Sequence, residues 1–144
     1  MNFETITKDT TCNCLEGVAE DTISTFARVL YKEKASEKDF YSKWDKGARD
    51  TDCEKVCGLK GVSVSKVCDE EVKNKIVSYY SDIFKISPNY KRGVLIFKIK
   101  KGAGVIKPTP SRNNPYHNDL YKSDAFALSA VEEVETCYLK PVSV

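Results

Sequence analysis

The segment Arg92-Gly-Val-Leu-Ile-Phe-Lys-Ile-Lys-Lys-Gly-Ala-Gly-Val-Ile-Lys107 joins two apolar runs through lysines and a Gly-Ala-Gly triplet. Successive residues of a strand point to opposite faces, so Leu95, Phe97 and Ile99 would form one apolar face. The other face would become cationic from Lys98 onward, and the triplet suits a turn. The segment therefore predicts a β-hairpin studded with lysines.

Positive charge is concentrated around this segment. Residues 83–118 hold eight of the 23 basic residues and none of the 21 acidic ones, so the other 108 residues carry 15 basic and 21 acidic groups, a net charge of −6. The eight are Lys85, Lys91, Arg92, Lys98, Lys100, Lys101, Lys107 and Arg112. The net charge of +2 alone indicates no particular partner. The concentration of positive charge in one segment indicates a polyanionic partner.

Single-stranded nucleic acid, RNA included, is the partner that this stretch favours. Lysines two apart on a strand project from one face about 6–7 Å apart, and aromatic side chains beside them would stack on bases. The predicted nucleic-acid-binding residues are Tyr90, Lys91, Arg92, Lys98, Lys100, Lys101, Lys107, Arg112 and Tyr116. The structural alternative is an edge strand that lysines protect from aggregation.

Two other functions remain open. A protein-interaction module, such as an inhibitor, an immunity-like protein or an accessory factor, would use the basic face to meet an acidic partner. A small ribonuclease would use His117, the single histidine, with Tyr, Lys and Arg around the phosphate. Phosphate-cradling and nucleophile-elbow motifs are absent. We therefore expect a binding protein rather than an enzyme, without a cofactor.

Six cysteines raise the question of a metal. Cys12, Cys14, Cys53 and Cys57 would supply four thiolates to zinc, and Cys68 or His117 would substitute for one. Neither pair has the usual Cys-x-x-Cys spacing, and a reduced cysteine also packs as a small apolar residue. The sequence leaves the zinc site open.

The length of 144 residues suits a single domain over residues 1–144, with 1–17 as an ordered arm. No segment approaches the ~20 apolar residues of a membrane helix, and no signal peptide is visible. We expect a cytoplasmic protein that does not enter a membrane. Its oligomeric state is open.

Apolar spacing predicts helices over about 19–32, 37–47, a short stretch after Asp52, 69–87 and 124–135. Alternation predicts a strand over 61–67, and a closing strand follows residue 135. A helix, glycine turn and second helix over 53–67 would instead resemble the helix-turn-helix motif, but the acidic residues 69–71 oppose it. The expected class is α+β, with four or five helices and a small antiparallel sheet built mainly from the C-terminal half.

Overall fold

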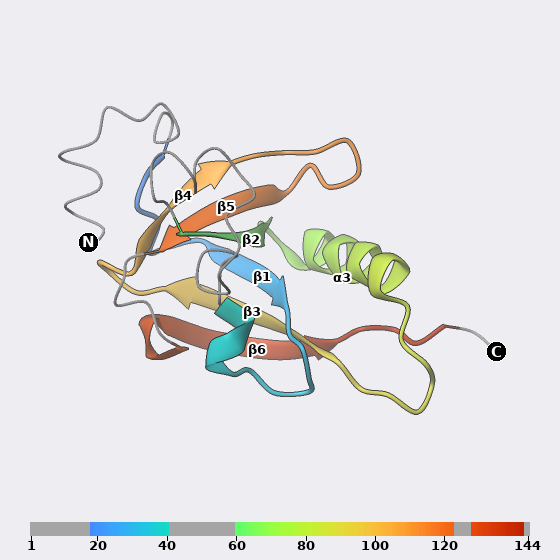
Figure 1. Ribbon diagram of the computed structural model, residues 1–144. Coiled ribbons are helices and arrows are strands. Elements are labelled where there is room, and N and C mark those ends of the chain that lie inside the picture. Colours follow the sequence, from blue (N-terminus) through green and yellow to red (C-terminus); the bar gives the residue numbers. More distant parts are fainter. Residues whose placement is uncertain (1–17, 41–59, 123–127, 143–144) are drawn as a thin grey trace.

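The computed structural model describes residues 18–40, 60–122 and 128–142, which form six strands and one α-helix (Figure 1). The α-helix is α3, Glu70–Phe84. The strands are β1 Thr25–Val29, β2 Lys60–Val67, β3 Gly93–Ile99, β4 Gly104–Pro108, β5 His117–Lys122 and β6 Val131–Tyr138. Two 3-10 turns, η2 Glu37–Phe40 and η3 Leu128–Ala130, complete the described elements.

All six strands form one antiparallel sheet in the order β4-β5-β2-β1-β3-β6. Strands β3 and β4 are consecutive in the chain, yet β1, β2 and β5 lie between them. Four strand spacings of a flat sheet measure about 19 Å, whereas the five residue steps from Ile99 to Gly104 reach about 17 Å at full extension. The sheet must therefore curl, which brings the end of β3 toward the start of β4.

The curl encloses the larger of two apolar cores. Phe26, Phe97 and Phe40 lie at its centre, where the Phe40 and Phe97 rings meet edge to face at 5.4 Å between centroids. Every strand contributes to this inner core, through residues such as Val64, Leu95, Ile106, Leu120 and Val131. The side chains on the concave face of the sheet therefore pack against one another and form this core.

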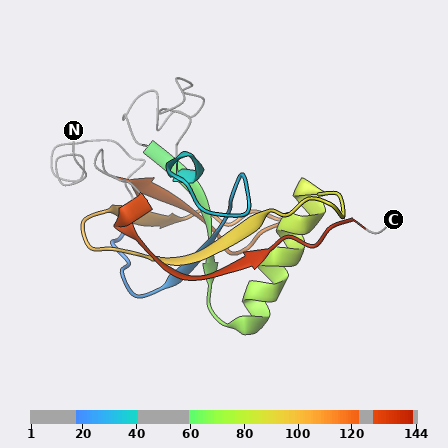
Figure 2. The ribbon, with the colours of Figure 1, turned by 90° about the horizontal axis from the view of Figure 1, so that it is seen from below.

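The second core lies on the outer face of the sheet, the face against which α3 lies (Figure 2). Its buried members are Ala27, Ile76, Ile86, Val94, Ile96 and Leu139. Strand β3 is therefore covered on both faces, as its nearly continuous apolar run requires. The predicted apolar face of Leu95, Phe97 and Ile99 is confirmed, and Val94 and Ile96 lie on the opposite face, in the outer core.

The helix predicted from residue 69 is confirmed as α3. Asp69 caps its N-terminus by accepting a hydrogen bond from the Val72 N–H at 2.8 Å, and Glu70 and Glu71 occupy the first turn, where the helix dipole favours acidic groups. The helix ends at Phe84 because Lys85 adopts a left-handed conformation, with φ of 34°.

The helix predicted over 19–32 is wrong, because this segment contains strand β1. Phe26 and Ala27 are adjacent and both fully buried, one in the inner core and the other in the outer core. A strand with two covered faces loses the alternation that distinguishes strands from helices. The apolar residues of β1, which belong to two opposite faces of the sheet, were therefore interpreted as one apolar face of a helix.

The helix predicted over 124–135 is also wrong where the structure describes it, since β6 begins at Val131. The sheet register passes from Ile96–Glu135 to Phe97–Glu133, so Val134 is an extra residue in a β-bulge. Val131 and Val134 are three residues apart, as on one face of a helix, but here the spacing results from the bulge in a strand. The closing strand predicted after residue 135 is the second half of β6.

The predicted β-hairpin is wrong as well. Strands β3 and β4 both exist, but β3 pairs with β1 and β6, and β4 pairs with β5. The strand over 61–67 is confirmed as β2, which excludes the helix-turn-helix alternative.

The expected α+β class with four or five helices is therefore replaced, over the described residues, by a six-stranded sheet with one α-helix. The sheet also draws strands from both halves of the chain. Of the helix predicted over 37–47, residues 37–40 form the turn η2. The rest of it, the helix after Asp52 and the arm over 1–17 lie outside the described residues.

Gly93 allows a close backbone approach beside the sheet. A Cβ atom there would lie 2.7 Å from the Glu33 carbonyl oxygen and 3.0 Å from Leu30 Cδ1. Because a backbone atom cannot swing aside as a side chain does, we expect Gly93→Ala to lower the free energy of unfolding by about 2–3 kcal/mol. Urea titration checks this, with Gly61→Ala as control, since its Cβ would meet only the Tyr121 ring at 3.1 Å. An equal loss in both variants would contradict the argument.

Candidate functional site

The structure divides the nine predicted nucleic-acid-binding residues into three groups. Tyr90, Lys91 and Arg92 precede β3. Lys98, Lys100 and Lys101 lie at its far end and in the following turn. Lys107, Arg112 and Tyr116 lie on β4 and on the loop that leads to β5. The first two groups are separated by the length of β3, and the third lies apart because β4 pairs with β5 and not with β3.

The first group lies among exposed aromatic rings. The Lys91 ammonium stands 4.2 Å from the centroid of the Tyr138 ring, and the Arg92 guanidinium stands 4.5 Å from that of Phe84. Tyr138 is the register partner of Gly93, and Leu139 N–H donates to the Arg92 carbonyl, so the end of β6 lies directly beside these cations. We call Phe84, Tyr90, Lys91, Arg92 and Tyr138 the cation–aromatic end.

The aromatic rings of this end are open to solvent. Tyr90 is 52% exposed, Phe84 40% and Tyr138 39%. Sequence reasoning assigned Phe84 to the apolar face of a helix and Tyr138 to a closing strand, and therefore missed both. The signal in the sequence was weak, since Phe84 is the last residue of its helix and only the start of β3 brings it against a cation.

Each cation of this end also has an intramolecular partner. Lys91 lies 3.2 Å from the Glu33 carboxylate, with both side chains at least half exposed. Arg92 Nε–H donates to the Leu30 carbonyl. An exposed ion pair of this kind contributes little stability, and the Arg92 bond uses one of five guanidinium donors. Both side chains therefore keep donors for a ligand.

Two more lysines extend the positive charge of this end. Lys85 and Lys140 are exposed, and they line one small cleft together with Asp82 and Ser81. The Lys140 N–H donates to Ser81 Oγ at 2.9 Å, which holds the segment after β6 against the last turn of α3.

The second group is spread along the other end of β3. Lys98 is half-buried and stands opposite Glu132 of β6 in the register. Lys100 and Lys101 are exposed beside the turn, where the Gly102 N–H donates to the Glu20 carboxylate. These lysines have acidic neighbours and no exposed aromatic ring from their own turn.

Within the third group, Tyr116 lines a cleft of about 410 Å³ at the ends of β2, β4 and β5. Its lining includes Lys66, Cys68, Tyr116, His117 and Asn118. Pro108, Pro110 and Pro115 form part of its wall, so the loop that carries Arg112 passes beside it. We call it the His117 cleft. Lys107 is half-buried and stands opposite Asp119 in the register.

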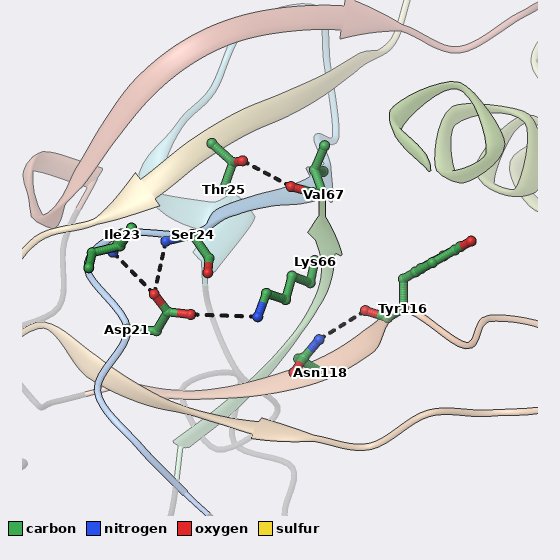
Figure 3. Close-up of polar contacts among 8 residues, drawn as sticks. All are labelled: Asp21, Ile23, Ser24, Thr25, Lys66, Val67, Tyr116 and Asn118. Carbon is green, nitrogen blue, oxygen red and sulfur yellow. Dashed lines mark hydrogen bonds and ion pairs between the residues drawn. The ribbon is translucent and has the colours of Figure 1, made fainter. Parts of the chain in front are cut away.

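Asp21 and Lys66 face each other in this cleft (Figure 3). Asp21 Oδ1 accepts hydrogen bonds from the Ile23 and Ser24 N–H groups at 3.1 and 2.9 Å, while Oδ2 lies 4.0 Å from Lys66 Nζ. Partial burial raises the pKa of Asp21, but the Ser24 and Ile23 hydrogen bonds and the Lys66 charge outweigh it and leave the pKa below its usual value. The backbone N–H groups therefore hold the Asp21 carboxylate beside the Lys66 ammonium.

His117 is held by the backbone of Thr109. Its Nδ1 lies 3.1 Å from the Thr109 carbonyl oxygen and 2.8 Å from the Thr109 hydroxyl. The carbonyl only accepts hydrogen bonds, whereas the hydroxyl either donates to Nδ1 or accepts from it, so these contacts hold the ring in place for either tautomer.

A buried polar network supports the loop before His117. Asn114 is 4% exposed, and its amide donates to Ser65 Oγ at 3.0 Å, which in turn lies 2.6 Å from the Tyr80 hydroxyl. Burial raises the pKa of Tyr80, because ionisation would place a charge under α3. Asn118 donates to the Tyr116 carbonyl at 2.9 Å (Figure 3). The cleft wall is thus tied to β2 and α3.

The zinc site stays a prediction. Cys12, Cys14, Cys53 and Cys57 lie outside the described residues. Cys68 is exposed in the His117 cleft and Cys137 is half-buried. Over residues 18–40, 60–122 and 128–142, no group of three or more His, Cys, Asp or Glu side chains has an arrangement that could hold a metal ion.

Comparison of the chain with protein-family models, with curated proteins and with solved structures found no match in any of the three. In the part of the chain that the structure describes, no helix has the length and apolar character needed to cross a membrane.

Proposed function

We propose that the protein binds single-stranded nucleic acid and that the cation–aromatic end is its principal contact surface. The observation that supports this most is the pairing of exposed rings with cations: Lys91 lies over Tyr138, and Arg92 over Phe84. Single-strand-binding surfaces combine the same two elements, because aromatic rings stack on bases while cations track the phosphates.

The composition of this end favours a nucleic acid over a protein partner. Lys85, Lys91, Arg92 and Lys140 outnumber the acidic neighbours Glu33, Asp82 and Glu133, the last of which lines a cleft together with Tyr138. Lysine is depleted in protein–protein interfaces but is a regular phosphate contact. The exposed phenol ring of Tyr90 extends the stacking surface without requiring any change in the fold.

We expect Tyr90→Ala to weaken binding of a single-stranded oligonucleotide about 5- to 150-fold, since loss of one stacked base costs about 1–3 kcal/mol. Lys91→Ala should weaken binding and reduce the salt slope of the affinity by about 1. Fluorescence anisotropy with labelled oligonucleotides of about 4–16 nucleotides measures both quantities.

The matched control is Lys75→Ala, which removes an exposed lysine from α3, where it pairs with Glu71. This variant should keep both the affinity and the salt slope of the wild type. Equal effects of Lys75→Ala and Lys91→Ala would contradict a localised site. Absence of binding to any oligonucleotide would reject the function and favour the protein-interaction module.

A further inference from the structure

The His117 cleft contains an anion, a cation and a buried amide that binding at the cation–aromatic end does not use. We propose that this cleft binds a guanine base, with the Asp21 carboxylate accepting hydrogen bonds from guanine N1–H and N2–H and the Lys66 ammonium donating to O6. This inference rests on the proposed function, because the guanine belongs to the bound single strand.

Asp21 and Lys66 form an anchored pair that a ligand can reach. Asp21 Oδ1 accepts hydrogen bonds from two backbone N–H groups, and Oδ2 faces Lys66 Nζ at 4.0 Å, which is longer than a hydrogen bond. The Asp21 side chain is 25% exposed and that of Lys66 is 46% exposed. The carboxylate therefore keeps acceptor sites for a ligand, and the ammonium beside it keeps donors.

Asn118 adds a buried amide to the same cleft (Figure 3). The residue is 5% exposed, and its NH₂ group donates to the Tyr116 carbonyl at 2.9 Å. Because a carbonyl only accepts hydrogen bonds, this contact fixes which side of the amide is the oxygen. Among the described residues, none donates a hydrogen bond to that oxygen. The cleft therefore offers a ligand more acceptors than donors.

The strand register places Asn118 and Lys66 on the same face of the sheet. Asn118 stands opposite Val64 of β2, and Lys66 lies two residues further along β2, opposite Phe26 of β1. Val64 and Phe26 both belong to the inner core. Diagonal neighbours of this kind are about 7–8 Å apart, and the ion pair brings Asp21 to Lys66. One small ligand therefore meets all three polar groups.

The remaining lining of the cleft is mostly apolar and suits the faces of a flat ring. Pro108 stands opposite Asn118 in the register, and Ile106 lies on the same face of β4. Pro110 and Pro115 add to this wall. The volume of about 410 Å³ lies within the usual range for small-ligand sites, which combine an apolar lining with a few polar groups. Because proline has a fixed φ, the wall loses little conformational entropy when a ligand binds.

Guanine is the nucleobase whose hydrogen-bonding edge matches these groups. Its Watson–Crick edge presents two neighbouring donor groups, N2–H and N1–H, followed by the acceptor O6. Adenine, cytosine and uracil each present one donor group on that edge. A carboxylate beside an ammonium therefore receives two donors and one acceptor from guanine alone, and unpaired bases are commonly recognised through this edge.

The position of the cleft is compatible with a strand bound at the cation–aromatic end. Cys68 in the cleft lies just before α3, whereas Phe84 is the last residue of α3. At a rise of 1.5 Å per residue, the two ends of α3 are about 21 Å apart. A single-strand site of about 4–16 nucleotides covers such a distance.

The test compares labelled oligouridine strands of about ten nucleotides that carry guanine, hypoxanthine or adenine at one central position. Hypoxanthine keeps N1–H and O6 but lacks the 2-amino group of guanine. We expect fluorescence anisotropy to show about 10- to 150-fold weaker binding of the hypoxanthine strand, as for loss of one hydrogen bond to a charged group. The adenine strand should bind at least as weakly.

Three variants locate the preference in the cleft. Asp21→Asn keeps an oxygen for the Ile23 and Ser24 N–H groups, so it should fold normally, yet its NH₂ group opposes the guanine donors and should abolish the preference. Lys66→Ala should reduce it. Tyr90→Ala should weaken the guanine and adenine strands alike and leave their ratio unchanged, because Tyr90 lies at the other end of α3.

Equal affinity for the three strands would overturn this inference and leave the proposed function intact. A guanine preference that persists in Asp21→Asn would also overturn it. Calorimetry with free guanosine 5′-monophosphate separates the remaining outcomes. Binding of this nucleotide that Asp21→Asn abolishes, without binding of any oligonucleotide, would reject the proposed function and retain the guanine site. Failure of both ligands to bind would reject both.

Discussion

Replacement of Phe97 by alanine is expected to lower the free energy of unfolding by about 3–5 kcal/mol. The ring is fully buried at the centre of the inner core, 6.3 Å from the centroid of Phe26 and 5.4 Å from that of Phe40. Removal of the ring loses its transfer free energy and leaves a cavity. Strands β1 and β3 surround this cavity and pair with each other, so they cannot easily collapse into it.

Urea denaturation followed by circular dichroism measures this change. Val134→Ala is the matched control, because Val134 lies in the bulge of β6 and is 51% exposed. It should change stability by less than about 0.5 kcal/mol. A loss below about 1.5 kcal/mol for Phe97→Ala would show that the curled sheet does not close over this ring.

Replacement of Asp39 by alanine is expected to cost about 3 kcal/mol of stability. The Asp39 side chain is 1% exposed, and its carboxylate accepts hydrogen bonds from the Tyr31 and Ser36 N–H groups, both at 2.7 Å. It also accepts from the Ser36 hydroxyl at 3.2 Å. Alanine would leave these partly buried donors without an acceptor. A buried donor without a hydrogen bond lowers the free energy of unfolding when water cannot reach it.

The Asp39→Asn variant distinguishes the contribution of the negative charge from that of the hydrogen bonds. Asparagine keeps one acceptor oxygen but turns an NH₂ group toward a backbone donor, so it should recover only part of the loss. Lys38→Ala is the control, because it removes an exposed side chain from the same 3-10 turn. Thermal unfolding of the three variants side by side gives the comparison. An Asp39→Ala protein as stable as Lys38→Ala would show that the loop is not held by this carboxylate.

These two positions also explain how the inner core is closed over the sheet. Asp39 precedes Phe40, which packs on Phe97, and the Arg28 side chain donates from β1 to the Asp39 and Ser63 carbonyls. The turn η2 is thus linked to β1 and β2 by polar contacts and to β3 by an aromatic contact. None of these contacts has a periodic signal in the sequence.

The candidate sites were predicted in part. Tyr90, Lys91 and Arg92 come together because they are consecutive or nearly so, and His117 with Tyr116 for the same reason. Phe84, Tyr138 and Lys66 were missed as partners, because each arrives from another strand or from α3. The expectation of one cationic ribbon depended on a β3–β4 hairpin, and the sheet order removes that premise.

The sequence allowed local interactions to be predicted, but not interactions between residues far apart in the chain. The acidic cap and apolar stripe of α3, the alternation of β2 and the two-faced pattern of β3 could all be recognised from neighbouring residues. Strand order, the curl of the sheet and the strand identity of β1 and β6 depended on which apolar faces bury each other. That choice is made by the free energy of the whole core, in which Phe26, Phe97 and Leu120 from three different strands exclude water together.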